Sequence, residues 1–187
     1  MRTILFILLI CFTTSCVAQK KIANLKDNTI EKALTNKYSI KREANGVSLN
    51  NTSNKFTGVK QISPNMAPNE TNLLAPLDRK KAVAQLTKIC ADIITLAQLE
   101  ELIKVNNSGL FIRIKTNIVG KPLELEFYTK ANPILTLNQL EGIEKEILQH
   151  FTIKLAPYTI NVVKGSNFLT FDYSIYFENM LKIKNNN

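Results

Sequence analysis

The sequence lacks tryptophan and has only one histidine, His150, in 187 residues. Ser-His-Asp and Cys-His catalytic sites need an imidazole, and zinc sites need several nitrogen or sulfur ligands close together. His150 falls at the C-terminal end of a predicted helix, where the helix dipole favours its charged form, so we expect a structural role. The six glycines are scattered singly and form no phosphate-binding loop. We therefore predict no catalytic residues, no cofactor and no metal.

Cysteine is also scarce, with three in the chain. Cys11 and Cys16 lie in a segment that export would remove or, at Cys16, lipidate. Cys90 is then alone, so the sequence excludes an intrachain disulfide framework. Cys90 falls on the apolar stripe of a predicted helix, and we expect a buried, unreactive thiol.

A short apolar run opens the chain. Arg2 is the only charge before residues 4–12, which are 9 consecutive apolar residues. This length suits the core of a signal peptide and falls short of the ~20 residues that span a bilayer. We predict that residues 1–18 are an export signal and that the protein is periplasmic or attached to the outer membrane.

The sequence leaves two alternative cleavage sites for this signal. Residues 13–16 resemble a bacterial lipobox, in which cleavage before Cys16 leaves that cysteine lipidated. Cys16-Val17-Ala18 instead places small residues before a cut after Ala18. The lipidated form is preferred, because the polar stretch that follows is typical of a tether.

Residues 19–76 are rich in Asn, Lys, Thr and Ser and are predicted to be a basic, mostly disordered linker. A short hairpin around Asn45-Gly46 is the alternative for one part of it. Residues 19–81 hold 12 Lys/Arg and 5 Asp/Glu, whereas residues 82–187 hold 11 and 10. The excess charge therefore belongs to the linker, where it suits a solvated spacer or contact with anionic headgroups. Because the folded part is nearly neutral, no nucleic-acid partner is expected.

The folded domain is predicted to span residues 77–181, with a disordered tail at 182–187. Apolar residues at steps of three and four predict helices over 79–94 and 95–105. Alternation then predicts a β-hairpin over 110–128, with Arg113 and Lys115 facing Glu124 and Glu126 across the strands.

A third helix follows, opened by a Thr136–Gln139 capping box. Its core stripe ends at Phe151, and Glu141, Glu144 and Glu146 are expected on the solvent side. The last strand covers 167–177. The predicted class is α+β: N-terminal helices, then hairpin, helix and strand, forming an antiparallel sheet with helices packed on one face.

This order of hairpin, helix and strand resembles the C-terminal domain of the TonB/TolA energy-transducer superfamily over residues 108–178. The positions that carry the resemblance are Gly120, Lys121, Leu135, Thr136, Phe151, Pro157 and Phe177. The resemblance implies a fold and a habit of binding periplasmic partners or strands at a sheet edge. The layout is similar to that of small exported proteins of Bacteroidetes-type bacteria.

The sequence departs from that family in ways that bear on function. Residues 129–132 lack the paired serines and glycine common after the second strand, and no long Pro-rich repeat precedes the domain. The N-terminal apolar run is also too short for the transmembrane anchor that a transducer needs. We expect a protein that does not itself transduce energy.

Three functions remain open. The preferred one is a non-catalytic envelope protein, a tethered domain that binds a protein or peptide, by strand addition among other modes. The second is a small exported hydrolase using Glu124 and Glu126, which share one strand face. A purely structural envelope component is the third.

Overall fold

A six-stranded antiparallel sheet runs through the computed structural model, in the order β1-β2-β3-β5-β4-β6. The model describes residues 19–65, 76–132 and 134–186, so the predicted signal segment, both cleavage sites and Cys16 lie outside the described residues. The strands are β1 (Thr29–Lys32), β2 (Lys37–Glu43), β3 (Gly46–Asn51), β4 (Gly109–Thr116), β5 (Pro122–Thr129) and β6 (Leu169–Tyr176).

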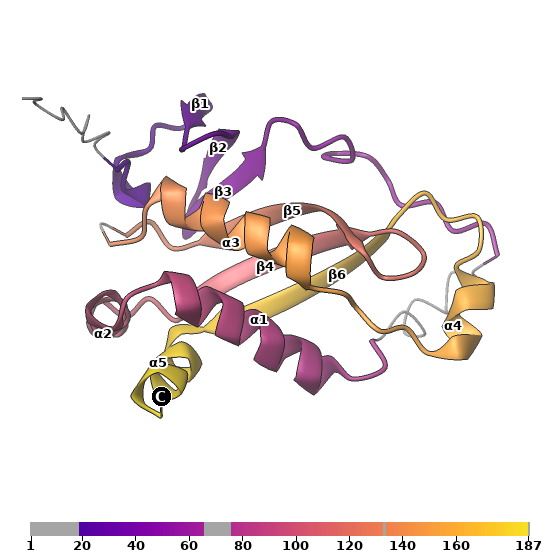
Figure 1. Cartoon of the computed structure of the whole chain (residues 1–187). Helices are drawn as coiled ribbons and strands as arrows, with labels where there is room; N and C mark the ends of the chain where they lie inside the picture. Colours follow the sequence, from indigo (N-terminus) through magenta and orange to yellow (C-terminus); the bar gives the residue numbers. More distant parts are fainter. Residues whose placement is uncertain (1–18, 66–75, 133, 187) are drawn as a thin grey trace, which may run out of the picture.

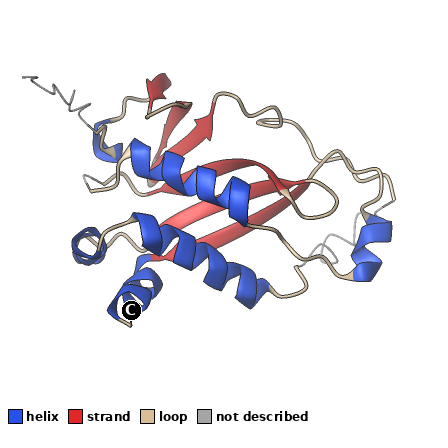
Figure 2. Ribbon diagram, in the orientation of Figure 1, coloured by secondary structure: helices blue, strands red, loops and turns tan. Residues whose placement is uncertain are grey.

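Helices α1 and α3 cover one face of this sheet (Figures 1 and 2). The helical elements are η1 (Ile22–Asn24), α1 (Arg79–Ile93), α2 (Leu96–Lys104), α3 (Leu137–His150), α4 (Pro157–Val162) and α5 (Phe177–Asn185). The predicted α+β class, with an antiparallel sheet and helices packed against it, is confirmed. We call the other face of the sheet the open face.

The helix starts follow the predicted capping residues. Asp78 accepts a hydrogen bond from the backbone N–H of Lys81 at the start of α1. Thr136 opens α3 with the predicted capping box, in which its hydroxyl and the Gln139 side chain each accept a backbone N–H. Thr95 does the same for α2. These bonds satisfy donors that the first turn of a helix leaves free.

The β4–β5 turn requires glycine at residue 120. Gly120 has a φ of +81°, and a Cβ built there would lie 1.8 Å from the carbonyl oxygen of Ile153. Gly120 also accepts a hydrogen bond from the Ile153 N–H. Beside it, the backbone N–H of Lys121 donates to the Asn117 side chain. The turn thus positions the segment that leaves α3, where Phe151 packs edge-on against Tyr173.

The predicted linker over residues 19–76 is wrong for the part that the structure describes. Strands β1, β2 and β3 belong to the same sheet as the later strands, and β3 pairs directly with β5. Three strands therefore precede α1, so the prediction that helices come first is also wrong, as is a domain boundary at residue 77. The hairpin expected around Asn45-Gly46 is confirmed as the β2–β3 hairpin.

The C-terminal boundary also moves. The chain does not end in a strand through Phe177 and a disordered tail, because Phe177 starts α5, which continues to Asn185. Phe177 and Met180 are buried, so this helix has an apolar face that packs on the rest of the fold. Packing of α5 on the fold thus orders residues whose polar composition, rich in Asn and Lys, predicted a disordered tail.

The prediction that Glu141 and Glu144 face solvent is wrong, because both are buried. Glu141 accepts hydrogen bonds from the backbone N–H groups of Thr35 and Asn36 in the β1–β2 turn. Glu144 accepts one from the Asn51 side chain, at the end of β3, over 3.0 Å. Since β1–β3 lie above these positions of α3, the two carboxylates fasten the N-terminal strands to the helix layer.

Candidate functional site

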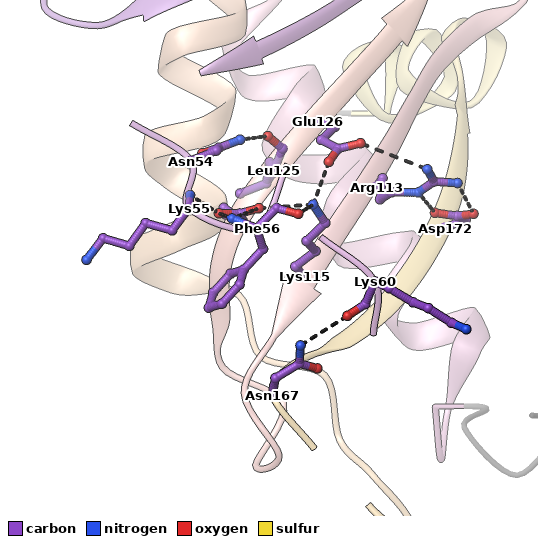
Figure 3. A network of polar contacts seen from close by, with 11 residues as sticks. Asn54, Lys55, Phe56, Lys60, Arg113, Lys115, Leu125, Glu126, Asn167 and Asp172 are labelled. Carbon is purple, nitrogen blue, oxygen red and sulfur yellow. Dashed lines mark hydrogen bonds and ion pairs between the residues drawn. The ribbon is translucent and has the colours of Figure 1, made fainter. Parts of the chain in front are cut away.

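Charged side chains from three neighbouring strands form a connected network on the open face (Figure 3). Arg113 on β4 donates to both carboxylate oxygens of Asp172 on β6, over 2.8 and 3.0 Å. Its Nη1 lies 3.9 Å from the carboxylate of Glu126 on β5. The hydrogen bonds to Asp172 raise the pKa of Arg113, so the guanidinium is held as a fixed charge.

Lys115, two residues further along β4, is the buried member of the network. Its ammonium group donates over 2.6 Å to Glu126 and over 3.1 Å to Glu124. A third hydrogen bond, of 2.6 Å, reaches the carbonyl oxygen of Phe56. Three donors therefore meet three acceptors, which offsets the cost of removing the charge from water.

Glu124 also fixes the loop that follows β3 over the open face. Its carboxylate accepts the backbone N–H of Lys55 over 2.7 Å and that of Phe56 over 3.0 Å. The Phe56 ring packs on Phe168, with ring centroids 4.9 Å apart. The loop is therefore fastened at both its backbone and its side chain.

The structure brings Glu124 and Glu126 together as the sequence predicts. Arg113 lies directly opposite Glu126 in the strand register, and Lys115 lies opposite Glu124, so the predicted cross-strand charge pairing is confirmed. Glu124 is 4% exposed and its carboxylate already accepts three partners. The two carboxylates thus have a structural use that favours the paired-charge interpretation over acid/base chemistry.

Two adjoining cavities lie beside this network on the open face, and we call them together the trough. Their volumes are about 340 and 360 Å³, and both are lined by Phe111 and Tyr128. The first cavity also borders the charged network at Arg113 and Glu126, and the second reaches Tyr176 at the end of β6. The other polar side chains along the trough include Glu43, Asn45, Ser48, Asn50, Asn107, Lys130 and Ser174.

Gly46 fixes the ring that divides the trough. A Cβ built on Gly46 would lie 2.7 Å from a ring carbon of Tyr128 and 2.6 Å from the carbonyl oxygen of Thr129. The Tyr128 ring therefore lies against the β3 backbone at a position where only glycine leaves room. An aromatic side chain held in this way presents a rigid surface at low conformational cost.

Two amide side chains along the trough lack partners within the described part of the chain. Asn107 is 3% exposed, and neither its Nδ2 nor its Oδ1 has a hydrogen-bond partner there. The buried Oδ1 of Asn50 also has no hydrogen-bond partner among the described residues. Buried polar groups are nearly always hydrogen-bonded, so these atoms are exceptions, as are the buried hydroxyls of Thr116 and Tyr173, which do not line the trough.

Sequence reasoning missed the trough. The outward direction of Phe111 and Tyr128 follows from the alternation of β4 and β5. The hollow itself depends on Gly46 from a strand that was predicted as linker, and on Asn107 from the end of α2. The useful signal was the glycine, since Gly within a strand indicates a close approach of another group.

The remaining candidates are Cys90 and His150. Cys90 is fully buried in α1, and burial raises the pKa of its thiol to about 12, as expected for an inert cysteine. His150 is exposed at the end of α3, and its Nε2 lies 3.7 Å from the Oε2 of Glu146. Within the described ranges, no group of three or more His, Cys, Asp or Glu side chains could hold a metal ion.

Over residues 19–65, 76–132 and 134–186, no single helix is both long and apolar enough to cross a membrane. Only α1 and α2 taken together reach the required length and composition, across a bend of 108°.

No family model and no curated protein matches the chain. Among solved structures, the chain is similar to a DUF5043 family protein from Bacteroides uniformis, with a TM-score of 0.63 and 17% identity. The match covers 84% of this chain and 88% of that one. At this identity the likeness shows the fold alone, and it agrees with the predicted likeness to small Bacteroidetes proteins. A TonB/TolA-like fold is not shown by these comparisons.

Proposed function

We propose that this chain is a non-catalytic, exported cell-envelope protein that binds a peptide segment of a partner protein in the trough. The observation that carries the proposal is the pair of adjoining cavities that share Phe111 and Tyr128, lined also by Asn107, whose side chain has no partner among the described residues, and by Asn50, whose Oδ1 has none. A peptide backbone offers one donor and one acceptor per residue, which is what free amide groups pair with.

The rest of the trough suits a protein partner. Its rings, Phe111, Tyr128 and Tyr176, are of the kind enriched in protein interfaces. The ion pairs beside it are already satisfied, since Arg113 is held by Asp172, and the lining charges without an ion pair in the described chain are those of Glu43 and Lys130. Peptide binding therefore explains both the apolar and the polar lining.

Strand addition at a sheet edge is the other binding mode to consider. The outer edge of β6 is partly occupied, because Gln61 accepts the N–H of Thr170 and Arg79 donates to the carbonyl of Asp172. Ser174, which also lines the trough, is the next residue along that edge with its backbone directed outward. We therefore place strand addition, if the partner uses it, at the Ser174 end of β6, next to the trough.

The test is partner capture with matched variants. Wild type, Asn107→Ala, Tyr128→Ala and Tyr158→Ala are used as baits in envelope extracts. Tyr158 is 58% exposed on α4 and serves as the control. We expect a partner that wild type and Tyr158→Ala retain and that the two trough variants lose at least tenfold. Asn107→Ala removes no side-chain hydrogen bond within the described chain. The unfolding free energy of this variant should therefore match that of wild type.

A partner retained equally by all four baits would contradict binding in the trough. If none of the four baits captured a specific partner, that result would contradict the proposed function itself. A small hydrolase using Glu124 and Glu126 and a structural envelope component are the alternatives, and no contact described above favours either of them. The likeness of residues 108–178 to TonB/TolA C-terminal domains also stays a proposal, without energy transduction.

Export and lipidation are part of the proposal and have their own test. The intact mass of the mature protein distinguishes cleavage before Cys16, with an attached lipid, from cleavage after Ala18. If Cys16 carries the lipid, Cys16→Ser releases the protein from the membrane fraction. Membrane association that survives this substitution unchanged would contradict the lipoprotein assignment.

A further inference from the structure

Strands β1 and β2 carry a set of lysines on the open face, at the edge of the sheet farthest from β6. Lys32, Lys37 and Lys41 are exposed, and Ile30 among them is 64% exposed. The register pairs Ile30 with Ser39 and Lys32 with Lys37, so these side chains project from the same face. We call Ile30, Lys32, Lys37 and Lys41 the lysine patch.

The positive charge of the lysine patch is not neutralised within the described chain. None of its three ammonium groups lies within ion-pair distance of a carboxylate there. Lys32 and Lys37 are direct cross-strand partners, an arrangement of like charges that opposes strand pairing. By contrast, Arg113 and Lys115 on the same sheet are fully paired. The patch thus places three positive charges without an ion pair on this face, two residues along β2 from the exposed carboxylate of Glu43, which accepts the Ser48 hydroxyl.

The chain enters the fold at the β1 edge of the sheet, which also carries Ile30 and Lys32 of the patch on its other face. The ammonium of Lys20 contacts the carboxylate of Glu31 on β1, and the Lys20 carbonyl accepts the backbone N–H of Leu137 at the start of α3, so the first described residues lie on the helix-covered side of that strand. A lipid on Cys16 would leave residues 17–19 as its only connection to the fold. Three extended residues span at most about 10 Å, in place of the long tether that the sequence predicts. The patch would then lie close to the headgroups.

We propose that the lysine patch docks the protein on an anionic phospholipid surface. Lysines attract such a surface within about one Debye length, and an exposed aliphatic residue among them inserts at the boundary between headgroup and acyl chain. Ile30 at the centre of the three lysines matches this combination. A patch for an acidic protein would need no exposed aliphatic side chain, so the lipid surface is the better fit.

Docking in this way leaves the β4 and β6 end of the trough accessible. Adjacent strands of a sheet are rotated by about 20–25°, so the four steps from β1 to β4 turn the open face by roughly 80–100°. The part of the trough at β4 and β6 therefore faces sideways when the lysine patch faces the membrane, whereas its Ser48 wall, opposite Lys41, lies beside the patch. The docking rests on the proposed function in that export and a lipid on Cys16 bring the protein to a membrane.

The test measures vesicle binding by the unlipidated chain from Gln19, which contains every described element. Phosphatidylcholine vesicles are compared with vesicles that also contain phosphatidylglycerol. We expect binding only to the anionic vesicles, and loss of binding at about 1 M salt, where the Debye length falls to about 3 Å. Each lysine replaced by alanine should weaken binding about fivefold, and Lys32→Ala/Lys37→Ala/Lys41→Ala together about a hundredfold.

The matched control is Lys80→Ala/Lys81→Ala/Lys154→Ala, which removes three exposed lysines from other elements and changes the net charge equally. Ile30→Ser should weaken binding without changing its salt dependence. Equal losses in the two triple variants, or no binding to anionic vesicles by wild type, would overturn the proposal. If the patch variant instead loses binding to polyglutamate while vesicle binding is unchanged, an acidic protein replaces the lipid as the partner.

Trough variants separate this proposal from the proposed function. Tyr128→Ala and Asn107→Ala should bind anionic vesicles as wild type does while losing the peptide partner. The lysine-patch variant should keep the peptide partner in detergent extracts. Each binding activity can therefore fail without the other.

Discussion

Glu144 and Tyr38, 106 residues apart in the sequence, meet in the core, where the Tyr38 hydroxyl donates a hydrogen bond to the Glu144 carboxylate. Tyr38 is at 0% exposure and Glu144 at 1%. Burial and the nearby negative charge of Glu144 raise the pKa of Tyr38, so the hydroxyl stays a donor at neutral pH. This bond joins β2 to α3 and makes the N-terminal strands part of the fold.

Tyr38→Phe is predicted to destabilise the protein by about 1–3 kcal/mol, because a buried carboxylate loses a donor. Tyr173→Phe is the matched control. The Tyr173 hydroxyl is buried without a hydrogen-bond partner among the described residues, so its removal should be neutral or slightly stabilising. Urea unfolding at pH 7 measures both. Equal destabilisation by the two substitutions would show that loss of a buried hydroxyl as such, and not loss of the bond to Glu144, controls the effect.

The two buried glutamates of α3 are predicted to give opposite pH dependences, starting with Glu141. Burial raises the pKa of Glu141, but hydrogen bonds from Thr35, Asn36 and Leu34 outweigh it, and the net pKa is lowered. The stability that this carboxylate contributes is present above its unfolded pKa of about 4.3 and is lost as the pH falls through the folded pKa. Glu141→Gln should therefore cost about 2 kcal/mol at pH 7 and less in acid.

For Glu144, the predicted pH dependence of stability has the opposite sign. Burial raises its pKa by more than the hydrogen bonds from Tyr38 and Asn51 lower it. The native state therefore binds this proton more tightly than the unfolded chain, and stability falls as the pH rises from about 4.3 through the folded pKa. Glu144→Gln should remove that fall. Unfolding free energies between about pH 3 and pH 7 test both variants, with exposed Glu146→Gln as control; parallel curves for all three would refute the assignment.

The central strands, α1, α2 and α3 were predictable because their signals are local. Apolar periodicity and two capping boxes sufficed, and the charges on the β4–β5 hairpin defined its register. The N-terminal strands were not predictable in this way. In β2 and β3 the helix-facing apolar residues are few, chiefly Tyr38, Ile40, Val47 and Leu49. So short an apolar pattern cannot be distinguished from that of a polar linker.

What orders the N-terminal strands lies about 100 residues away. Glu141 supplies acceptors to the β1–β2 turn, and β5 supplies an edge for β3 to pair with. From sequence alone, a glutamate on a helix with apolar neighbours reads as solvent-facing, since Glu is rarely buried unless paired. The trough depends on the same long-range pairing, because it forms only when β3 lies beside β5.

Lys115→Met is predicted to destabilise the protein by about 3–5 kcal/mol, because it leaves the buried Glu124 without its cation. The loop that Glu124 holds should loosen as well. Amide hydrogen exchange at Lys55 and Phe56, whose N–H groups bond to Glu124, should accelerate more than the global change in stability requires. Lys121→Met, at the exposed β4–β5 turn, is the matched control. Unchanged exchange at Lys55 and Phe56 relative to the core would show that the loop is held by other contacts.

Alanine is predicted to have opposite effects at Gly142 and Gly120. Gly142 lies inside α3, and a Cβ there would meet only Ile93 side-chain carbons, at 3.7 and 3.8 Å, which is ordinary van der Waals contact. Gly142→Ala should therefore stabilise the protein by about 1 kcal/mol, the helix-propensity difference. Gly120→Ala would place a Cβ 1.8 Å from the Ile153 carbonyl oxygen at a positive φ, and should cost at least about 1–3 kcal/mol. Thermal unfolding compares the two variants directly. A loss of stability in Gly142→Ala would mean that α1 and α3 pack more closely than these distances indicate.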